Sequence, residues 1–80
     1  MKIVFSKRAV KALDRMDSTI KQRIGKGISG LPKGDIKKLQ GHTDLYRLRI
    51  GDWRIVYSYM DANTILIENI DLRGQVYKGV

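Results

Sequence analysis

The segment Leu45–Tyr59 constrains the fold of this chain more than any other, because it has the pattern of a β-hairpin. Large apolar and polar side chains alternate on both sides of Gly51-Asp52, and glycine at the first position of a two-residue connection is typical of a type II′ turn. The pattern predicts that Ile50 lies opposite Trp53. The pairing then continues as Arg49 with Arg54, Leu48 with Ile55, Arg47 with Val56, and Tyr46 with Tyr57.

This register sorts the hairpin into two faces, because successive side chains of a strand point to opposite sides of the sheet. One face is basic and carries Arg47, Arg49 and Arg54. Like charges directly opposite one another destabilise a sheet by up to roughly 1 kcal/mol per pair, and a bound polyanion would remove that repulsion. The alternative is that these arginines are ordinary solvated positions of a basic protein. The other face is apolar and suits packing beneath helices: Tyr46, Leu48, Ile50, Trp53, Ile55 and Tyr57.

The chain before the hairpin predicts one short strand and two helices. Lys2–Phe5 is rich in β-branched and aromatic residues, and Ser6 is a suitable N-cap for a helix that begins at Lys7. Asp17-Ser18 can end that helix and cap a second one. Apolar residues recur at helical spacing in both segments, which predicts an αα-hairpin that packs on the sheet: Val10, Leu13 and Met16, then Ile20, Ile24, Ile28 and Leu31.

Gly25 and Gly27 fall inside the second predicted helix. An interior glycine costs a helix roughly 1 kcal/mol relative to alanine, so this helix depends on its tertiary contacts. Close approach to a neighbouring backbone is one explanation for the two glycines.

Further strands are predicted on both sides of the hairpin. Ile36–Gln40 forms a short strand, and Thr64–Leu72 forms a strand whose first residues are apolar on both faces, as in the interior of a sheet. If Ala62-Asn63 is the connecting loop, Asp71 lies across from Arg54 and Arg73 projects from the basic face. A three-residue turn would reverse this. In the tail, Arg73 and Tyr77 could fold back over the hairpin.

These elements predict a single domain, residues 1–80, of the α+β class. The expected order is β-α-α-β-β-β, with the N-terminal helical hairpin on one face of a mainly antiparallel, twisted sheet of three or four strands. The other face of the sheet, which is the basic one, is expected to stay open.

Composition restricts the function to a few classes. Sixteen Lys and Arg against eight Asp and Glu give a net charge of +8, which favours binding to nucleic acid or to an acidic protein. The sequence has no Cys, no apolar run of membrane-spanning length and no signal-peptide pattern, so we expect a cytoplasmic protein. His42, the only histidine, has no second His or Cys at ligand spacing, and neither a metal nor a cofactor is expected.

The remaining chemistry is a group of guanidinium side chains together with a phenol. Guanidinium groups bind phosphate and stabilise charge that develops during phosphoryl transfer, while tyrosine can stack on a base or relay a proton. This set suits RNA cleavage by the RNA's own 2′-hydroxyl, and it equally suits binding without chemistry.

Three segments resemble the RelE/ParE superfamily of toxins from type II toxin–antitoxin systems: Lys38–Gly41, Tyr46–Tyr57 and Arg73–Tyr77. RelE-like members are ribosome-dependent endoribonucleases that cut mRNA in the A site without a metal and leave a 2′,3′-cyclic phosphate. ParE-like members share the fold but poison DNA gyrase. The resemblance thus implies an mRNA interferase, with a gyrase inhibitor or a non-catalytic binding homologue as alternatives.

The resemblance also implies roles for individual residues. Arg47 and Arg49 match the basic strand pair, Arg54 the transition-state arginine, Arg73 a further active-site arginine, and Tyr77 the tyrosine that stacks on the substrate. Lysine is common at the strand pair in this family, and a guanidinium stays protonated, so Arg49 cannot readily act as a general base. The base would then be Tyr77, a ribosomal group or water.

The implied partners are a cognate antitoxin and the ribosome with its 16S rRNA and mRNA. Toxin and antitoxin could form a heterotetramer. Six basic residues outside the arginine set are expected to contact RNA or the ribosome: Lys7, Arg8, Lys11, Lys37, Lys38 and Lys78.

Overall fold

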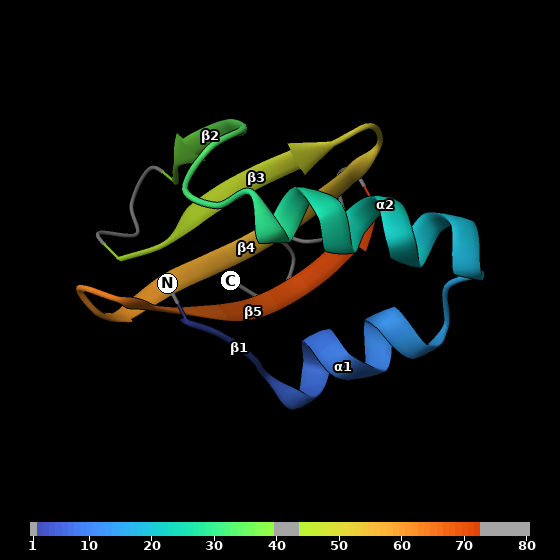
Figure 1. Ribbon diagram of the computed structural model, residues 1–80, viewed down its shortest axis with the longest axis horizontal. Helices are drawn as coiled ribbons and strands as arrows, with labels where there is room; N and C mark the ends of the chain where they lie inside the picture. Colours follow the sequence, from blue (N-terminus) through green and yellow to red (C-terminus); the bar gives the residue numbers. More distant parts are fainter. Residues whose placement is uncertain (1, 40–43, 73–80) are drawn as a thin grey trace.

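The computed structural model describes residues 2–39 and 44–72. Its elements follow the predicted order, and they form a five-stranded sheet with the spatial order β1-β5-β4-β3-β2. The bounds of the elements are β1 Lys2–Phe5, α1 Lys7–Asp14, α2 Ser18–Ser29, β2 Asp35–Lys38, β3 Tyr46–Ile50, β4 Trp53–Asp61 and β5 Thr64–Leu72 (Figure 1).

The α+β class and the antiparallel character of the sheet are confirmed, and the strand count is larger than expected. β2, β3, β4 and β5 pair antiparallel, and β1 adds a fifth strand parallel to β5. β5 can accept a neighbour on each side because its first residues are apolar on both faces, with Ile65 and Ile67 fully buried. No helix in the described residues is long and apolar enough to cross a membrane.

Both predicted helix starts are confirmed. The Ser6 hydroxyl accepts a hydrogen bond from the Ala9 amide at 3.1 Å, and it donates one to the Glu68 carbonyl at 2.7 Å. This side chain therefore caps α1 and also ties the helix to β5. The Asp17 carboxylate caps α2 by accepting from the Ile20 amide at 2.9 Å.

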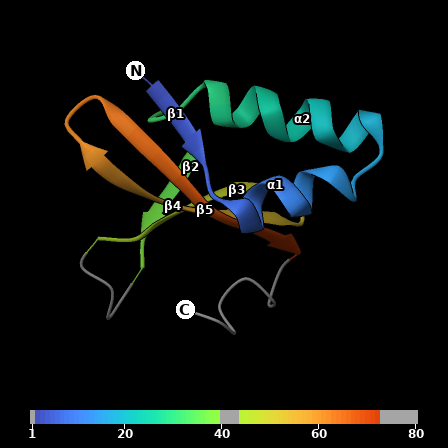
Figure 2. The ribbon, with the colours of Figure 1, turned by 90° about the horizontal axis from the view of Figure 1, so that it is seen from below.

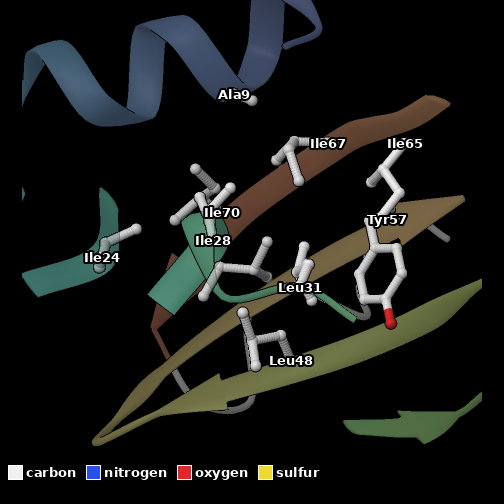
Figure 3. Close-up of a cluster of buried hydrophobic side chains, with 10 residues drawn as sticks. Ala9, Ile24, Ile28, Leu31, Leu48, Tyr57, Ile65, Ile67 and Ile70 are labelled. Carbon is white, nitrogen blue, oxygen red and sulfur yellow. The ribbon is translucent and has the colours of Figure 1, made fainter. Parts of the chain in front are cut away.

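The two helices lie on the same side of the sheet (Figure 2). Ala9 of α1 and Ile24 and Ile28 of α2 are buried against the apolar residues of the strands. Figure 3 shows Leu48 and Tyr57 on the strands that form the floor of this core. Tyr46, Ile50 and Trp53 are partly buried at its margin, so the whole predicted apolar face packs against the helices.

Gly27 is explained by this packing, although the neighbour is a side chain and not a backbone. A Cβ atom at Gly27 would collide with the side chain of Ile50. Gly25 has no such constraint, since a Cβ there would meet nothing within 4 Å. Only one of the two glycines is required by close packing between α2 and β3.

The central hairpin has the predicted register, residue for residue. Gly51 has a φ of 59°, and Asp52 is not among the residues with positive φ. A type I′ turn would need positive φ at both positions, so the geometry fits the predicted type II′ turn.

The second hairpin is less regular than the sequence suggested. Ala62-Asn63 is the connection, as assumed, and β4 extends through Met60 and Asp61 up to it. The register shifts once between Tyr59 and Asp61, where Met60 is the extra residue, and again between Val56 and Tyr57, where Glu68 is the extra residue of β5. The two shifts cancel, so Arg54 lies opposite Asp71 as predicted.

Candidate nucleic-acid interface

The three described arginines of the predicted site project from the face of the sheet opposite the helices. Leu48 and Ile55 face each other across β3 and β4 and are buried in the core at 2% and 0% exposure. Because side chains alternate along a strand, Arg47, Arg49 and Arg54 project on the other side. We call this side of the sheet, which carries Arg47, Arg49 and Arg54, the arginine face.

Two acidic residues flank the arginine pair in a row that crosses four strands. Asp35 of β2 lies opposite Arg49, Arg49 lies opposite Arg54, and Arg54 lies opposite Asp71 of β5. Asp71 was expected opposite Arg54, whereas Asp35 opposite Arg49 is a second acidic neighbour that the sequence did not predict. The row combines two basic and two acidic residues, so a polyanion is not needed to offset the repulsion between the arginines.

Arg47 is held against the neighbouring strand. Its Nη1 atom lies 3.4 Å from Oδ1 of Asp35 and donates a hydrogen bond to the Asp35 carbonyl at 3.3 Å. Only 12% of the Arg47 side chain is exposed. Arg54 is half-buried, Arg49 is exposed, and Val56 on the same face is buried. The face is therefore less open than expected, and Arg49 is the most accessible of its three arginines.

A further acidic residue lies on the arginine face beside β4. Oγ of Ser58 donates to Oε2 of Glu68 at 3.1 Å. The hairpin alone could not predict Asp35, Glu68 and Asp71 as neighbours of the arginines. Asp35 precedes the strand expected at Ile36–Gln40, and Glu68 is the extra residue of an irregularity in β5. The available signal was the Ala62-Asn63 loop, which placed Asp71 correctly.

The expected RNA-binding lysines separate into two groups. Lys7, Arg8 and Lys11 are exposed on α1, whereas the arginine pair lies on β3 and β4. Lys37 pairs with Arg47 and shares the arginine face, whereas Lys38 pairs with Tyr46 and projects toward the helix side. Four predicted residues lie outside the described residues: His42, Arg73, Tyr77 and Lys78.

A cleft of about 860 Å³ opens between α1 and the C-terminal half of β5. It was not predicted from the sequence, because it depends on where α1 crosses the sheet. Trp53 lies in its wall beside the basic residues of α1. The full lining is Lys7, Arg8, Lys11, Ala12, Arg15, Met16, Asp17, Ile20, Trp53, Asn69, Ile70 and Asp71.

Three tyrosines cluster on the helix side of the sheet. The rings of Tyr46 and Tyr57 are stacked with centroids 5.5 Å apart, and Tyr59 meets both edge-on. Burial raises the pKa of Tyr57 to about 12, and the neighbouring phenols of Tyr59 and Tyr46 add to this effect. Tyr57 is therefore a neutral phenol near neutral pH and cannot serve there as a general base.

The described site offers guanidinium groups, carboxylates and hydroxyls. Within residues 2–39 and 44–72, no three His, Asp or Glu side chains come together in a way that could hold a metal ion. Charge-assisted hydrogen bonds from guanidinium to phosphate are the strongest interactions this set can make. The arrangement is thus suited to gripping a phosphodiester and to stabilising added negative charge on it.

Comparison with known proteins finds relatives among toxins of type II toxin–antitoxin systems. Residues 3–77 match the family model described as the ParE toxin of the type II toxin–antitoxin system parDE. Toxin RelE3 of Methanocaldococcus jannaschii is 31% identical over an alignment of 86 positions, gaps included, that covers 96% of each chain. Putative toxin RelE1 of the same organism is 43% identical over 47 residues, which cover 58% of this chain and 52% of the relative.

Solved structures of archaeal complexes are similar in both fold and sequence. A RelE–RelB complex from Pyrococcus horikoshii OT3 superposes with a TM-score of 0.73 at 30% identity, covering 92% of this chain and 96% of the other. A RelB–RelE antitoxin–toxin complex from Methanococcus jannaschii gives a TM-score of 0.75 at 30% identity, covering 92% and 94%. The isolated Escherichia coli RelE toxin, at 22% identity and a TM-score of 0.72, shares the fold. With its helical hairpin, its mixed sheet and a family match over nearly its whole length, the chain belongs to the RelE/ParE superfamily of toxins of type II toxin–antitoxin systems.

Proposed function

We propose that this toxin is a metal-independent endoribonuclease that cleaves mRNA in the ribosomal A site and is neutralised by a cognate antitoxin. The observation that carries the proposal is the direct pairing of Arg49 with Arg54 on the face of the sheet opposite both helices. The curated relatives are named as RelE toxins, and related structures are described as complexes of RelE with the antitoxin RelB.

The proposed reaction proceeds without a metal ion, because Tyr77, a ribosomal group or water takes the proton from the 2′-oxygen. The 2′-oxygen loses its proton and forms a bond to phosphorus, the bond from phosphorus to the 5′-oxygen breaks, and the 5′-oxygen takes up a proton. The products are a 2′,3′-cyclic phosphate and a 5′-hydroxyl. Negative charge grows on the phosphoryl oxygens in the transition state, where fixed cationic donors have their largest effect.

The arginines differ in how they can contribute. Arg54, half-buried between Arg49 and Asp71, is the proposed transition-state contact. Arg49 is exposed and is proposed to hold the phosphate and stabilise the activated 2′-oxygen. Arg47 bonds to Asp35 and is proposed to position β2 beside the site. Arg73 and Tyr77 complete the proposal as a further arginine and a stacking tyrosine.

Toeprinting of a translated message with purified toxin tests this function. The wild-type chain should give new cuts in the A-site codon, and Arg54→Ala should lower the cleavage rate about 10²- to 10³-fold, as for loss of one transition-state donor. Ribosome binding of the variant should change little, because the contact is made mainly in the transition state. Lys26→Ala is the matched control, since Lys26 is exposed on α2 and outside the cleft.

Several outcomes would contradict the proposal. Absence of A-site cuts from a folded wild-type chain that arrests growth would exclude ribosome-dependent cleavage. Unchanged growth arrest by Arg54→Ala would favour a non-catalytic binding role. Equal losses of ribosome affinity for Arg54→Ala and Lys7→Ala would show that the active site is not on the hairpin. Lys7 should act only through salt-dependent binding.

A second candidate function is inhibition of DNA gyrase. The family model that matches residues 3–77 is described as a ParE toxin, and this observation favours the alternative. A gyrase poison should make cleaved gyrase–DNA complexes accumulate when purified toxin, gyrase and supercoiled plasmid are mixed. The nuclease proposal predicts no such accumulation, and the two assays therefore separate the two candidates.

A further inference from the structure

The cleft lies beside the part of β5 where α1 replaces β1 as its neighbour. β1 pairs with β5 only from Thr64 to Ile67, and the Ser6 amide donates to the Ile67 carbonyl just before α1 begins. Beyond this point α1 runs beside β5, and Asn69–Asp71 form part of the cleft. At about 860 Å³ the cleft is within the range of sites that bind a molecule the size of one or two nucleotides.

One wall of the cleft is basic. Successive helical residues are separated by about 100°. At that spacing the three basic residues of α1 and its C-cap, Arg15, fall within an arc of about 100° on one side of the helix. Asp17 and Asp71 are the acidic residues of the lining, so basic side chains outnumber acidic ones by two to one. The basic residues are Lys7, Arg8, Lys11 and Arg15, and all are exposed.

The other part of the lining is apolar and includes one aromatic ring. Ala12 of α1 and Met16 of the connection between α1 and α2 border the basic residues, Ile20 follows on α2, and Trp53 comes from β4. Trp53 lies at the margin of the core and is neither fully buried nor fully exposed. It directly precedes Arg54, whose side chain projects from the opposite face, so the cleft lies one residue from the proposed transition-state contact.

We propose that this cleft binds a single-stranded RNA segment, with phosphates along the basic residues of α1 and a base stacked on Trp53. The inference rests on the proposed function in taking RNA as the ligand. A row of cations beside an aromatic ring is the combination that proteins use for single strands without strong sequence preference, because each nucleotide supplies both a phosphate and a planar base. An acidic peptide would satisfy the cations but would leave the indole without a planar partner.

The chain contains a single Trp, so its intrinsic fluorescence reports on Trp53 alone. Titration of the full chain with an oligomer of six 2′-deoxyuridines, which lack the attacking hydroxyl and cannot be cleaved, should quench this fluorescence. The affinity should fall as salt is added. An oligomer of six abasic residues has the same phosphates without bases and should bind more weakly with little quenching.

Variants separate the two parts of the cleft. Lys11→Ala should lower the affinity and reduce the slope of log K against log salt by about 0.7, as for one phosphate contact to a single strand. Trp53→Leu should weaken binding of a labelled oligomer roughly tenfold, since leucine has no ring on which a base can stack. Because Trp53 also packs at the core margin, circular dichroism and the thermal midpoint of this variant are measured alongside. Lys26→Ala should behave as wild type.

Three results would overturn the proposal. They are equal quenching by the abasic oligomer, equal affinity and quenching by a hexaglutamate peptide, and binding unchanged in both Lys11→Ala and Arg15→Ala. Lys11 and Arg15 are exposed and lie outside the core, so replacing either should not impair folding. Failure of the nuclease proposal appears separately, as absence of A-site cuts by a chain that still shows base-dependent quenching.

Discussion

The two faces of the central hairpin are built from alternate residues of the same strands, yet they differ in how they are stabilised. On the helix side, Leu48, Ile55 and Tyr57 are 0–2% exposed and belong to one buried cluster with residues of both helices. On the arginine face, Arg49 and Arg54 lie opposite one another with acidic residues on either side. Packing on the helix side needs only apolar partners of suitable size. Charge balance on the arginine face depends on which residues of β2 and β5 lie opposite each arginine.

The largest expected effect comes from opening a cavity on the helix side. Ile55→Ala should lower the free energy of unfolding by about 2–5 kcal/mol, because a fully buried side chain is removed. Arg49→Ala, an exposed position on the other face, should change it by less than about 0.5 kcal/mol. Urea denaturation measures both. Similar losses for the two variants would mean that the faces do not differ in this way.

The next effect is a loss of stability at high pH that arises on the helix side. The Tyr57 phenol titrates near 12 in the folded chain, against 10.0 for an unperturbed tyrosine. Below pH 10 both states hold the proton. Between pH 10 and 12 the unfolded chain releases it first, so the stabilisation is lost as pH rises, by at most about 3 kcal/mol. Tyr57→Phe should reduce this loss in denaturation measured at several pH values, whereas Tyr59→Phe, at an exposed position, should retain most of it.

A smaller effect compares the two glycines of α2. Gly25→Ala should stabilise the chain by about 0.5–1 kcal/mol, because a Cβ there meets nothing and alanine favours the helix. Gly27→Ala should be less stable than Gly25→Ala by at least about 1 kcal/mol, since its Cβ displaces Ile50. Thermal unfolding of the two variants decides the matter. Adding Ile50→Val to Gly27→Ala should recover part of the difference, and no recovery would exclude Ile50 as the cause.

The smallest expected effect tests charge balance on the arginine face. Asp71→Asn removes the acidic residue opposite Arg54, and it should destabilise the chain by about 0.5 kcal/mol at low salt. In an Arg49→Gln background the same change should cost less, because the repulsion across the pair is already gone. Denaturation of the single and double variants at low and high salt measures this coupling. A coupling that does not weaken in high salt would rule out an electrostatic origin.

The parts of the fold that were predictable depend on residues close together in the sequence. The register of the first hairpin follows from Gly51-Asp52 and the alternation around it, and the helix starts follow from Ser6 and Asp17. Each depends on a turn or cap whose partners lie within a few residues. The resemblance to toxin families adds the overall topology, which the structural matches support.

The parts that were missed depend on contacts between distant segments. The parallel pairing of β1 with β5 joins residues about sixty positions apart, and no local pattern specifies it. The same holds for the pairing of Asp35 with Arg49 and for the cleft between α1 and β5. The placement of the arginines on one face and of Asp71 opposite Arg54 was thus predicted, whereas Asp35, Glu68 and the low accessibility of Arg47 were not.

The two register shifts of the second hairpin determine which residues of β5 face the helices. With a regular ladder from the Ala62-Asn63 turn, Tyr57 would pair with Glu68, and Ile65 and Ile67 would point away from the helices. Met60 and Glu68, the supernumerary residues, prevent this inversion. Deletion of both Met60 and Glu68 would keep every other cross-strand pair but remove the two bulges that bend the sheet. The curvature of the arginine face could therefore be changed without replacing any arginine.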